Sequence, residues 1–311
     1  MATILITGGT GMIGRELVNL LTDRGHAIII ATRNPKREAS NQQGVSFARW
    51  DIKAQTIEAF AIEKADYIIH LAGAGVADKR WSKKRKKEIV ESRTQSSALL
   101  VNALKTYKHT VKAVVSASAI GWYGPDPAVP NPHPFEENAN PNEDFLGETC
   151  RLWEESISPV EQLGIRLVKL RTGIVLSDTG GALKEFLKPL RFGIAAILGS
   201  GKQIVSWIHV DDLCRIYLKA IDDEQMSGAY NAVAPKPVSN KTLTLDLAKA
   251  VKNKFFIPMY VPSFVLKMAL GEMSIEVLKS ATVSANKIRS AGFNFVYPTI
   301  EAAINQLVKK K

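Results

Sequence analysis

The chain has 311 residues, a length that predicts one large α/β unit or two coupled domains. Hydrophobic residues make up 46% and charged residues 23%, and this composition excludes a disordered protein. Its formal net charge is +11, and much of the excess comes from KRWSKKRKK at residues 79–87 and KKK at 309–311. Neither zinc-ligand spacing nor the aromatic pattern of RNA-binding sheets accompanies this charge, so we expect no metal site and favour nucleic-acid binding least.

Taken in chain order, the apolar pattern alternates between short strands and helical stretches. The predicted order is strand 3–7, helix 15–24, strand 27–31, strand 67–71, helix 88–105, strand 111–116, helix 146–162 and strand 166–170. Strands that alternate with helices at this spacing are typical of a parallel sheet with helices on both faces. We therefore expect an α/β fold with a doubly wound parallel sheet and a smaller C-terminal α/β domain.

A glycine-rich loop, GGTGMIG at residues 8–14, follows the first predicted strand and precedes the first predicted helix. Glycine permits a tight turn and lets the backbone approach a pyrophosphate, while the helix presents its free N–H groups to the phosphates. This context is the one that a dinucleotide site requires, so the sheet is predicted to be Rossmann-like. The predicted cofactor contacts in the loop are Gly8, Thr10, Gly11, Met12, Ile13 and Gly14.

The end of the second predicted strand distinguishes between the two nicotinamide cofactors. NAD sites usually place an acidic residue there, on the ribose 2′-hydroxyl. Here the strand ends at Arg33, and Lys36 and Arg37 follow with no acidic residue between them. Positive charge suits a 2′-phosphate. The sequence therefore favours NADP(H) over NAD(H), and a purely surface role for Arg33 is the alternative.

Two domains are expected. Residues 1–171, with 203–234 returning to them, are predicted to form the NADP-binding Rossmann domain, and residues 172–202 with 235–311 a smaller substrate-binding domain. The stretch 124–144 is rich in proline, which forbids a helix, and loops of this length are usually functional or mobile.

The cysteine content and the hydropathy pattern indicate where the protein works. The two cysteines, Cys150 and Cys214, are too few for a disulfide scaffold, and a reducing environment is therefore favoured. The N-terminus lacks the pattern of a signal peptide, and no apolar run reaches transmembrane length. We expect a cytoplasmic monomer or homodimer with no membrane partner and an unknown small-molecule substrate.

Five segments carry a resemblance to a known superfamily: TGGTGMIG (7–14), WDI (50–52), HLAGAG (70–75), SASAIGWYG (116–124) and SWIHVDDL (206–213). They resemble the extended short-chain dehydrogenase/reductases, in the nucleoside-diphosphate-sugar epimerase-like branch. The resemblance implies that Asp51 touches the adenine and that Ser118 is the active-site serine. It further implies that the adenine–ribose side is lined by Leu71, Ala72 and Gly73.

Other segments across the chain resemble an atypical subfamily: RW (80–81), SR (92–93), GGAL (180–183), YNAVAP (230–235) and GFNFVYP (292–298). Ordinary members of the superfamily use a Tyr-x-x-x-Lys pair as general acid/base and ribose anchor. In FLGETCRLWE (145–154) the resemblance puts Leu146 at the tyrosine and Cys150 at the lysine, with Arg93 where an asparagine is frequent. Leucine carries no proton, so the usual mechanism does not transfer.

Several residues are candidates to replace the lost pair. Cys150 is an acid/base candidate if a nearby cation lowers its pKa, and a small packing residue otherwise. Tyr123 is a second candidate, with packing under the proline-rich loop as the alternative, and Glu148 is a third. Arg93 is predicted to anchor the nicotinamide half of the cofactor or a substrate oxygen, beside Ser118.

Three functions are compatible with these observations. The first is an NADP(H)-dependent epimerase or oxidoreductase with a non-standard active site, acting on a small polar or nucleotide-linked substrate. The second is a catalytically silent NADP(H)-binding sensor or scaffold, which the loss of both Tyr and Lys favours. The third is a nucleic-acid-binding protein on an epimerase fold, which only the basic charge favours.

Overall fold

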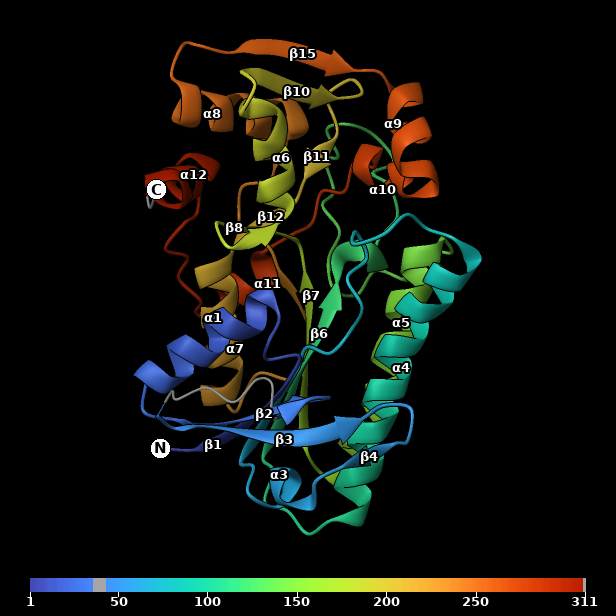
Figure 1. The fold of residues 1–311 in the computed structure, drawn as a ribbon, viewed down its shortest axis with the longest axis vertical. Helices are drawn as coiled ribbons and strands as arrows, with labels where there is room; N and C mark the ends of the chain where they lie inside the picture. The colour runs from blue at the N-terminus through green and yellow to red at the C-terminus, as the bar shows by residue number, and fades with distance from the viewer. Residues whose placement is uncertain (36–42, 310–311) are drawn as a thin grey trace.

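The structure, a computed structural model, describes residues 1–35 and 43–309, and Figure 1 shows two lobes. The larger lobe is built on an eight-stranded sheet in the order β13-β7-β6-β5-β1-β2-β3-β4, in which every pairing is parallel except β3 with β4. Its strands are β1 (Thr3–Thr7), β2 (Ala27–Thr32), β3 (Val45–Asp51), β4 (Thr56–Ile57), β5 (Tyr67–His70), β6 (Ala113–Ala119), β7 (Arg166–Thr172) and β13 (Gly228–Ala232).

Helices cover both faces of this sheet. On one face lie α1 (Met12–Asp23) and α7 (Val210–Asp222), and on the other α3 (Ala59–Glu63), α4 (Lys83–Thr106) and α5 (Phe145–Ile157). Side chains alternate along each strand, so neighbouring residues of β6 enter different cores: Val114 packs with the α4 side and Val115 with the α7 side. The predicted doubly wound parallel sheet is confirmed.

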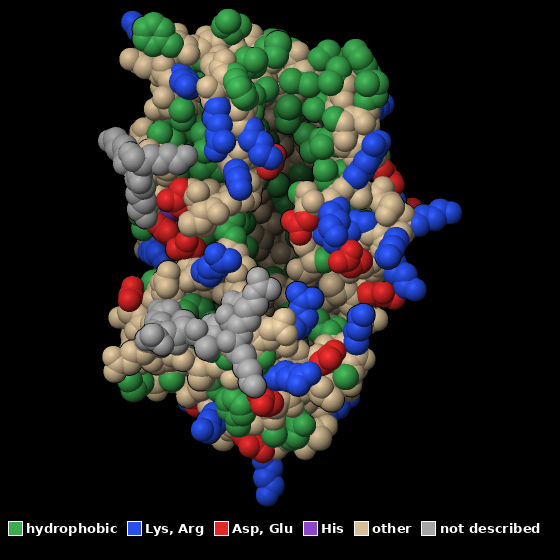
Figure 2. All heavy atoms as spheres, viewed as in Figure 1, with side chains coloured by type: hydrophobic (Ala, Val, Ile, Leu, Met, Phe, Trp, Pro, Cys, Tyr) green, Lys and Arg blue, Asp and Glu red, His purple; other side chains and the backbone are tan. Residues whose placement is uncertain are grey.

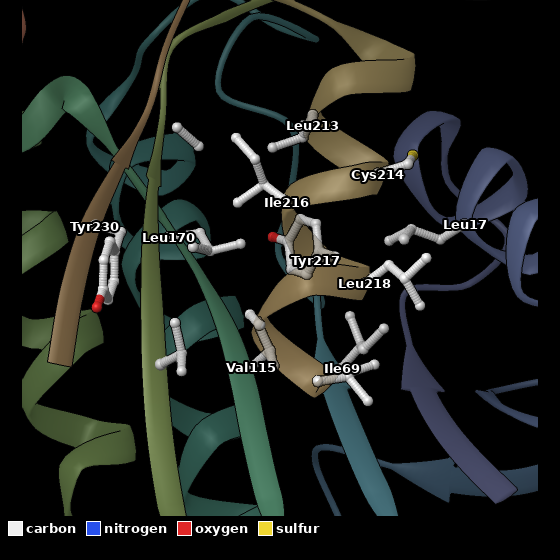
Figure 3. Packing of buried hydrophobic residues seen from close by; sticks show 14 of the residues in the cluster. Leu17, Ile69, Val115, Leu170, Leu213, Cys214, Ile216, Tyr217, Leu218 and Tyr230 are labelled. Atoms are coloured by element: carbon white, nitrogen blue, oxygen red, sulfur yellow. The ribbon is translucent and has the colours of Figure 1, made fainter. Parts of the chain in front are cut away.

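The core under α7 is the larger hydrophobic cluster. Figure 3 shows Ile216 and Tyr217 of α7 facing Ile69, Val115 and Leu170 of three neighbouring strands. All five side chains are fully buried. Near-continuous apolar strands are what a parallel sheet covered on both faces needs, and this requirement explains why the sequence pattern located the strands.

Among the described residues, the smaller lobe contains short strands and five α-helices. A three-stranded sheet is formed by β8 (Ile174–Ser177), β9 (Gly180–Gly181) and β12 (Trp207–His209), and two pairs by β10 (Ile194–Leu198) with β15 (Ile257–Val261) and by β11 (Ile204–Val205) with β14 (Val238–Ser239). The helices described in it are α6 (Ala182–Leu190), α8 (Asn240–Lys252), α9 (Ser263–Leu270), α10 (Ser274–Leu278) and α12 (Ile300–Lys309). Helix α11 (Asn286–Ser290) instead packs on β13, and its Ile288 lies in the core under α7. A separate core joins α6, α8 and α12.

The main departures from the predicted elements concern β3 and the start of α4. The sequence pattern missed β3, whose residues alternate between exposed and buried positions. Helix α4 begins at Lys83 rather than at residue 88, because Ser82 accepts a hydrogen bond from the backbone N–H of Arg85. Within this basic segment Arg85 is buried, donates to the carbonyl of Gly75 and forms an ion pair with Glu88 at 2.7 Å.

The proline-rich stretch is tied to residues 280–284, in part through the carboxylate of Asp126. Asp126 accepts hydrogen bonds from the side chains of Asn131, Ser280 and Thr282 at 2.8–2.9 Å and from the backbone N–H of Thr282 at 2.9 Å. Further along, Phe135 forms a β-bridge with Val283. The stretch is therefore joined to residues 280–284 at several points.

Neither a membrane-spanning helix nor a cluster of metal ligands is present among the described residues. No described helix combines the length and the apolar character needed to cross a bilayer. Within residues 1–35 and 43–309, no group of three or more His, Cys, Asp or Glu side chains is arranged to hold a metal ion.

Candidate active site and cofactor cleft

A hollow separates the two lobes in Figure 2. The carboxyl ends of β6 and β7 point toward it in Figure 1, and β8 of the smaller lobe stands above it. Strands β5 and β1 run parallel to β6 in the same sheet. In open α/β sheets ligands bind outside the carboxyl ends of the strands. Most of the residues that the sequence singled out lie at these strand ends.

The glycine loop leaves no space for a side chain at two of its positions, Gly8 and Gly14. Gly8 has φ of 72°, a conformation that favours glycine, and a Cβ on it would lie 3.0 Å from the carbonyl carbon of Leu71. A Cβ on Gly14 would lie 2.4 Å from the carbonyl oxygen of Gly8 and 2.6 Å from Cα of Gly9. Only hydrogen fits at Gly14, so the first turn of α1 packs directly on the loop.

The N-terminus of α1 fits a phosphate group. Gly11 is the N-cap and no described side chain caps the helix, which also carries no acidic residue in its first turn. The N–H groups at the start of a helix need an acceptor and attract anions. The side chain of Met12 lies against Gly180 and Gly181, with its sulfur 3.2 Å from the position that a Cβ on Gly181 would occupy. The hairpin of β8 and β9 in the smaller lobe therefore contacts the first residue of α1, directly after Gly11 of the loop.

The residues predicted to read the adenine and ribose lie at the ends of β2 and β3. Arg33 directly follows β2 and is exposed, while Lys36 and Arg37 lie outside the described residues. Asp51 ends β3 and accepts hydrogen bonds from the backbone N–H groups of Ala54 at 3.1 Å and Lys53 at 2.9 Å, which lower the pKa of its carboxyl. Its carboxylate thus also holds the turn after β3.

Thr7 and His70, which the sequence reasoning missed, fix the segment that the resemblance placed beside the adenine. Thr7 Oγ1 lies 2.7 Å from His70 Nδ1 and accepts from the backbone N–H groups of Leu71 and Ala72 at 3.2 and 3.3 Å. Burial lowers the pKa of His70 to about 4, so the ring is neutral at pH 7. The only sequence signal was a polar residue at the end of each apolar strand.

Arg93 lies beneath the same segment. Its Nη1 donates to the carbonyls of Ala74 at 3.0 Å and Ile89 at 2.8 Å, and its guanidinium lies 4.8 Å from the ring centroid of Trp153. A Cβ on Gly73 would lie 3.3 Å from this guanidinium. Burial lowers the pKa of Arg93. The side chain thus joins α4, α5 and the loop after β5.

Ser118 belongs to a buried polar network between β6, β7 and α5. Its hydroxyl donates to Oε1 of Glu154 at 2.7 Å, and Glu154 accepts from Nε of Arg171 at 2.8 Å and from Nη2 at 3.1 Å. Arg171 and Glu154 are 3% and 5% exposed, so this is a buried ion pair. Burial acts to lower the pKa of Arg171, but the hydrogen bonds and charge of Glu154 outweigh it and raise that pKa.

Tyr123 joins the same network from the end of β6. Its hydroxyl donates to Oδ1 of Asn231 at 2.7 Å and accepts from Nη1 of Arg171 at 3.1 Å, and its ring stacks on Phe135 with centroids 5.3 Å apart. Burial raises the pKa of Tyr123 to about 12. The phenol is therefore protonated at neutral pH, with its hydrogen directed at an amide.

Cys150 and Leu146 both lie against Gly121, since a Cβ on that glycine would be 3.5 Å from Sγ of Cys150 and 3.1 Å from Cβ of Leu146. Burial raises the pKa of the Cys150 thiol to about 12, although the nearby charge of Arg93 acts to lower it. The third acid/base candidate, Glu148, is exposed and forms an ion pair with Arg151 at 2.6 Å.

Comparison with known proteins identifies the family. Residues 4–232 match the model of the NAD dependent epimerase/dehydratase family, and residues 261–307 match a domain of unknown function, DUF1731. The chain belongs to the NAD dependent epimerase/dehydratase family. An epimerase family protein of Staphylococcus aureus is 36% identical over 315 residues, covering 100% of both chains, and Epimerase family protein YfhF of Bacillus subtilis is 33% identical, covering 98% of this chain and 97% of its own.

Solved structures of the epimerase family give the same fold. Human epimerase family protein SDR39U1, solved with NADPH, superposes with a TM-score of 0.84 at 27% identity, covering 99% of this chain and 100% of its own. The nucleoside-diphosphate sugar epimerase from Corynebacterium glutamicum gives 0.77 at 31% identity, covering 100% of this chain and 59% of its own. The resemblance drawn from the sequence motifs is confirmed at the level of this epimerase family, and so is the Rossmann-like fold.

Proposed function

We propose that this epimerase-family chain binds NADP(H) in the cleft between its lobes and acts as an epimerase or oxidoreductase on a small polar or nucleotide-linked substrate. The observation that carries the proposal is the geometry of the glycine loop. No side chain fits at Gly8 or Gly14, and the start of α1 beside them has no side-chain cap, so its N–H groups are available to a phosphate. In the proposed division, residues 1–171 and 203–234 bind the cofactor, and residues 172–202 and 235–311 bind the substrate.

The preference for NADP(H) rests on the end of β2. Arg33 is exposed there, and no acidic residue lies between Thr32 and Arg37 to bind a ribose 2′-hydroxyl. The similar human protein SDR39U1 was solved with NADPH. We propose that Arg33 contacts the 2′-phosphate and that Asp51, Leu71, Ala72 and Gly73 line the adenine–ribose side.

The proposed catalytic arrangement lacks the usual Tyr-x-x-x-Lys pair, whose positions Leu146 and Cys150 take. Since the hydrogen of Ser118 Oγ is donated to Glu154, we propose that the serine accepts a hydrogen bond from a substrate hydroxyl. Arg93 is the positive charge that acts most strongly to lower the pKa of Cys150 and, in this proposal, anchors the nicotinamide half of the cofactor.

The cofactor proposal predicts the effect of Arg33→Asp. Losing a charged hydrogen bond and placing an acid beside the 2′-phosphate should weaken NADPH binding about ten- to a hundredfold, while NADH binding improves. Isothermal titration calorimetry with both cofactors measures the two affinities. Arg24→Asp, the same change at an exposed residue at the opposite end of α1, should leave both unchanged. Equal affinities of the wild-type protein for NADPH and NADH would contradict the proposal.

A second candidate function, a catalytically silent NADP(H)-binding sensor or scaffold, is favoured by the state of the acid/base candidates. The hydroxyl of Tyr123 is occupied by Asn231 and Arg171, and the thiol of Cys150 is buried with its pKa raised to about 12. Neither group is ready to exchange a proton at neutral pH.

Cys150→Ser separates the two candidate roles of the thiol. Because the thiol is buried and protonated, we expect the native protein to react slowly with iodoacetamide at pH 8, and Cys150→Ser to keep NADPH affinity within about twofold. Alkylation followed by mass spectrometry measures the first expectation and calorimetry the second. Rapid alkylation of Cys150 in the folded protein would show a reactive thiol, and the packing role would then be wrong.

A further inference from the structure

The tip of the smaller lobe exposes large apolar side chains. Phe192 and Phe255 are 83% and 85% exposed at one end of the β10–β15 pair, and Ile257 and Met259 follow along β15. Phe264 and Met268 continue the surface on α9. Figure 2 shows hydrophobic side chains gathered over this upper end of the molecule, where Figure 1 places β15 and α9. Contiguous exposed apolar surface of this kind marks an interaction site.

Strand β10 is covered on one face, whereas β15 is exposed along most of its length. Ala195 and Ile197 of β10 are buried, and α6 and α8 pack on that strand. The opposite face carries Ile257 and Met259 of β15 opposite Ile194 and Ala196 of β10. Helix α9 likewise buries only Leu266 of its eight residues. Side chains that a globular fold would bury are therefore left facing outward.

The open edge of β15 is not suited to pairing with another strand. The backbone N–H of Ile257 donates to the carbonyl of Gly193 beside β10, so in a parallel ladder the backbone of the next residue, Pro258, faces the open edge. Proline has no N–H to donate, and it blunts an exposed edge. The outer side chains, rather than the strand edge, therefore form the binding surface.

Positive charge surrounds this apolar surface. Residues 172–202 and 235–311 contain 16 Lys and Arg against 6 Asp and Glu, which is +10 of the net charge of +11. Exposed Arg191, Lys254 and Lys267 directly precede Phe192, Phe255 and Met268 in the chain, and none of these three cations forms an ion pair with another described residue. Four of the six acids already pair with lysines: Glu185, Asp246, Glu272 and Glu276.

We propose that this tip docks on an anionic lipid surface, with the phenylalanines among the acyl chains and the cations at the headgroups. Basic residues interleaved with aromatic ones are typical of peripheral membrane binding, and each cation near an anionic bilayer strengthens it. A second copy of the chain is a poorer occupant, because two surfaces of the same strong positive charge would face each other. The sequence analysis predicted no membrane partner, since the exposed apolar residues come from segments that are separate in the chain.

The test uses the full chain and sedimentation with vesicles of phosphatidylcholine alone or with phosphatidylglycerol added. We expect binding to the anionic vesicles only, weakened by salt. Phe255→Ser with Phe264→Ser should lower the partition coefficient at least about tenfold. Lys254→Gln with Lys267→Gln should lower it about fivefold for each cation removed. Lys64→Gln with Lys108→Gln, at exposed residues of the larger lobe, is the matched charge control and should change nothing.

Thermal melting checks that each variant is folded. We expect all of them to fold, because the four substituted residues at the tip are exposed. Equal binding to neutral and anionic vesicles, or binding that survives loss of both phenylalanines, overturns the proposal. So does the absence of binding at low salt. A wild-type dimer in analytical ultracentrifugation that Phe255→Ser with Phe264→Ser dissociates would instead assign the surface to a second copy.

Discussion

Glu154→Leu should lower the free energy of unfolding by about 3–5 kcal/mol, because it leaves the buried guanidinium of Arg171 without its carboxylate. The pair is held by two hydrogen bonds of 2.8 and 3.1 Å, and both side chains are almost fully buried. Ser118 loses the acceptor of its hydroxyl in the same variant. Urea unfolding followed by circular dichroism measures the change.

The double variant Glu154→Leu with Arg171→Met is the control for this prediction. Replacing both members of a buried ion pair with apolar residues is often neutral or stabilising, so most of the lost stability should return. A loss below about 1 kcal/mol in Glu154→Leu would contradict the prediction, since such a value is typical of a solvent-exposed pair.

Gly14→Ala should reduce NADPH affinity about a hundredfold or more. Its Cβ would lie 2.4–2.7 Å from backbone atoms of Gly8 and Gly9, which cannot turn aside as a side chain can. The loop must move, and with it the N–H groups at the start of α1 that are proposed to bind the pyrophosphate. Losing two such charged hydrogen bonds costs about 3–6 kcal/mol. Fluorescence titration with NADPH measures the affinity.

Gly25→Ala is the matched control for the glycine loop. Gly25 has φ of 80° with nothing near its missing Cβ, so alanine there is strained but touches nothing. It should cost about 1 kcal/mol of stability and leave NADPH affinity unchanged. Should Gly14→Ala bind NADPH as tightly as Gly25→Ala does, the pyrophosphate would not be bound at this loop.

Local sequence patterns were sufficient for most of the sheet and for the glycine loop. The strands of a parallel sheet are buried on both faces, so they read as apolar runs such as Thr3–Thr7 and Tyr67–His70. The glycine loop is recognisable because its steric demands fall on neighbouring residues. Strand β3 alternates between exposed and buried side chains and lies near the edge, where this pattern is weaker.

The polar interior of the site was beyond sequence reasoning because its members come from distant segments. Ser118, Glu154 and Arg171 lie on three different elements, and Tyr123 reaches Asn231 across 108 positions. The sequence gave the residue types but not the pairings. Hence the motifs identified Tyr123 as a candidate acid without indicating that its hydroxyl already donates one hydrogen bond and accepts another.

The hydrogen bonds of Asp126 determine which parts of the molecule open together. Ordering a long irregular loop costs conformational entropy, and here contacts of Asp126 with Ser280 and Thr282, together with its bond to Asn131 inside the loop, offset part of that cost. Residues 124–144 and 280–284 are further joined by the bridge between Phe135 and Val283, so opening one segment breaks the contacts of the other. We therefore expect residues 124–144 and 280–284 to open as one cooperative unit.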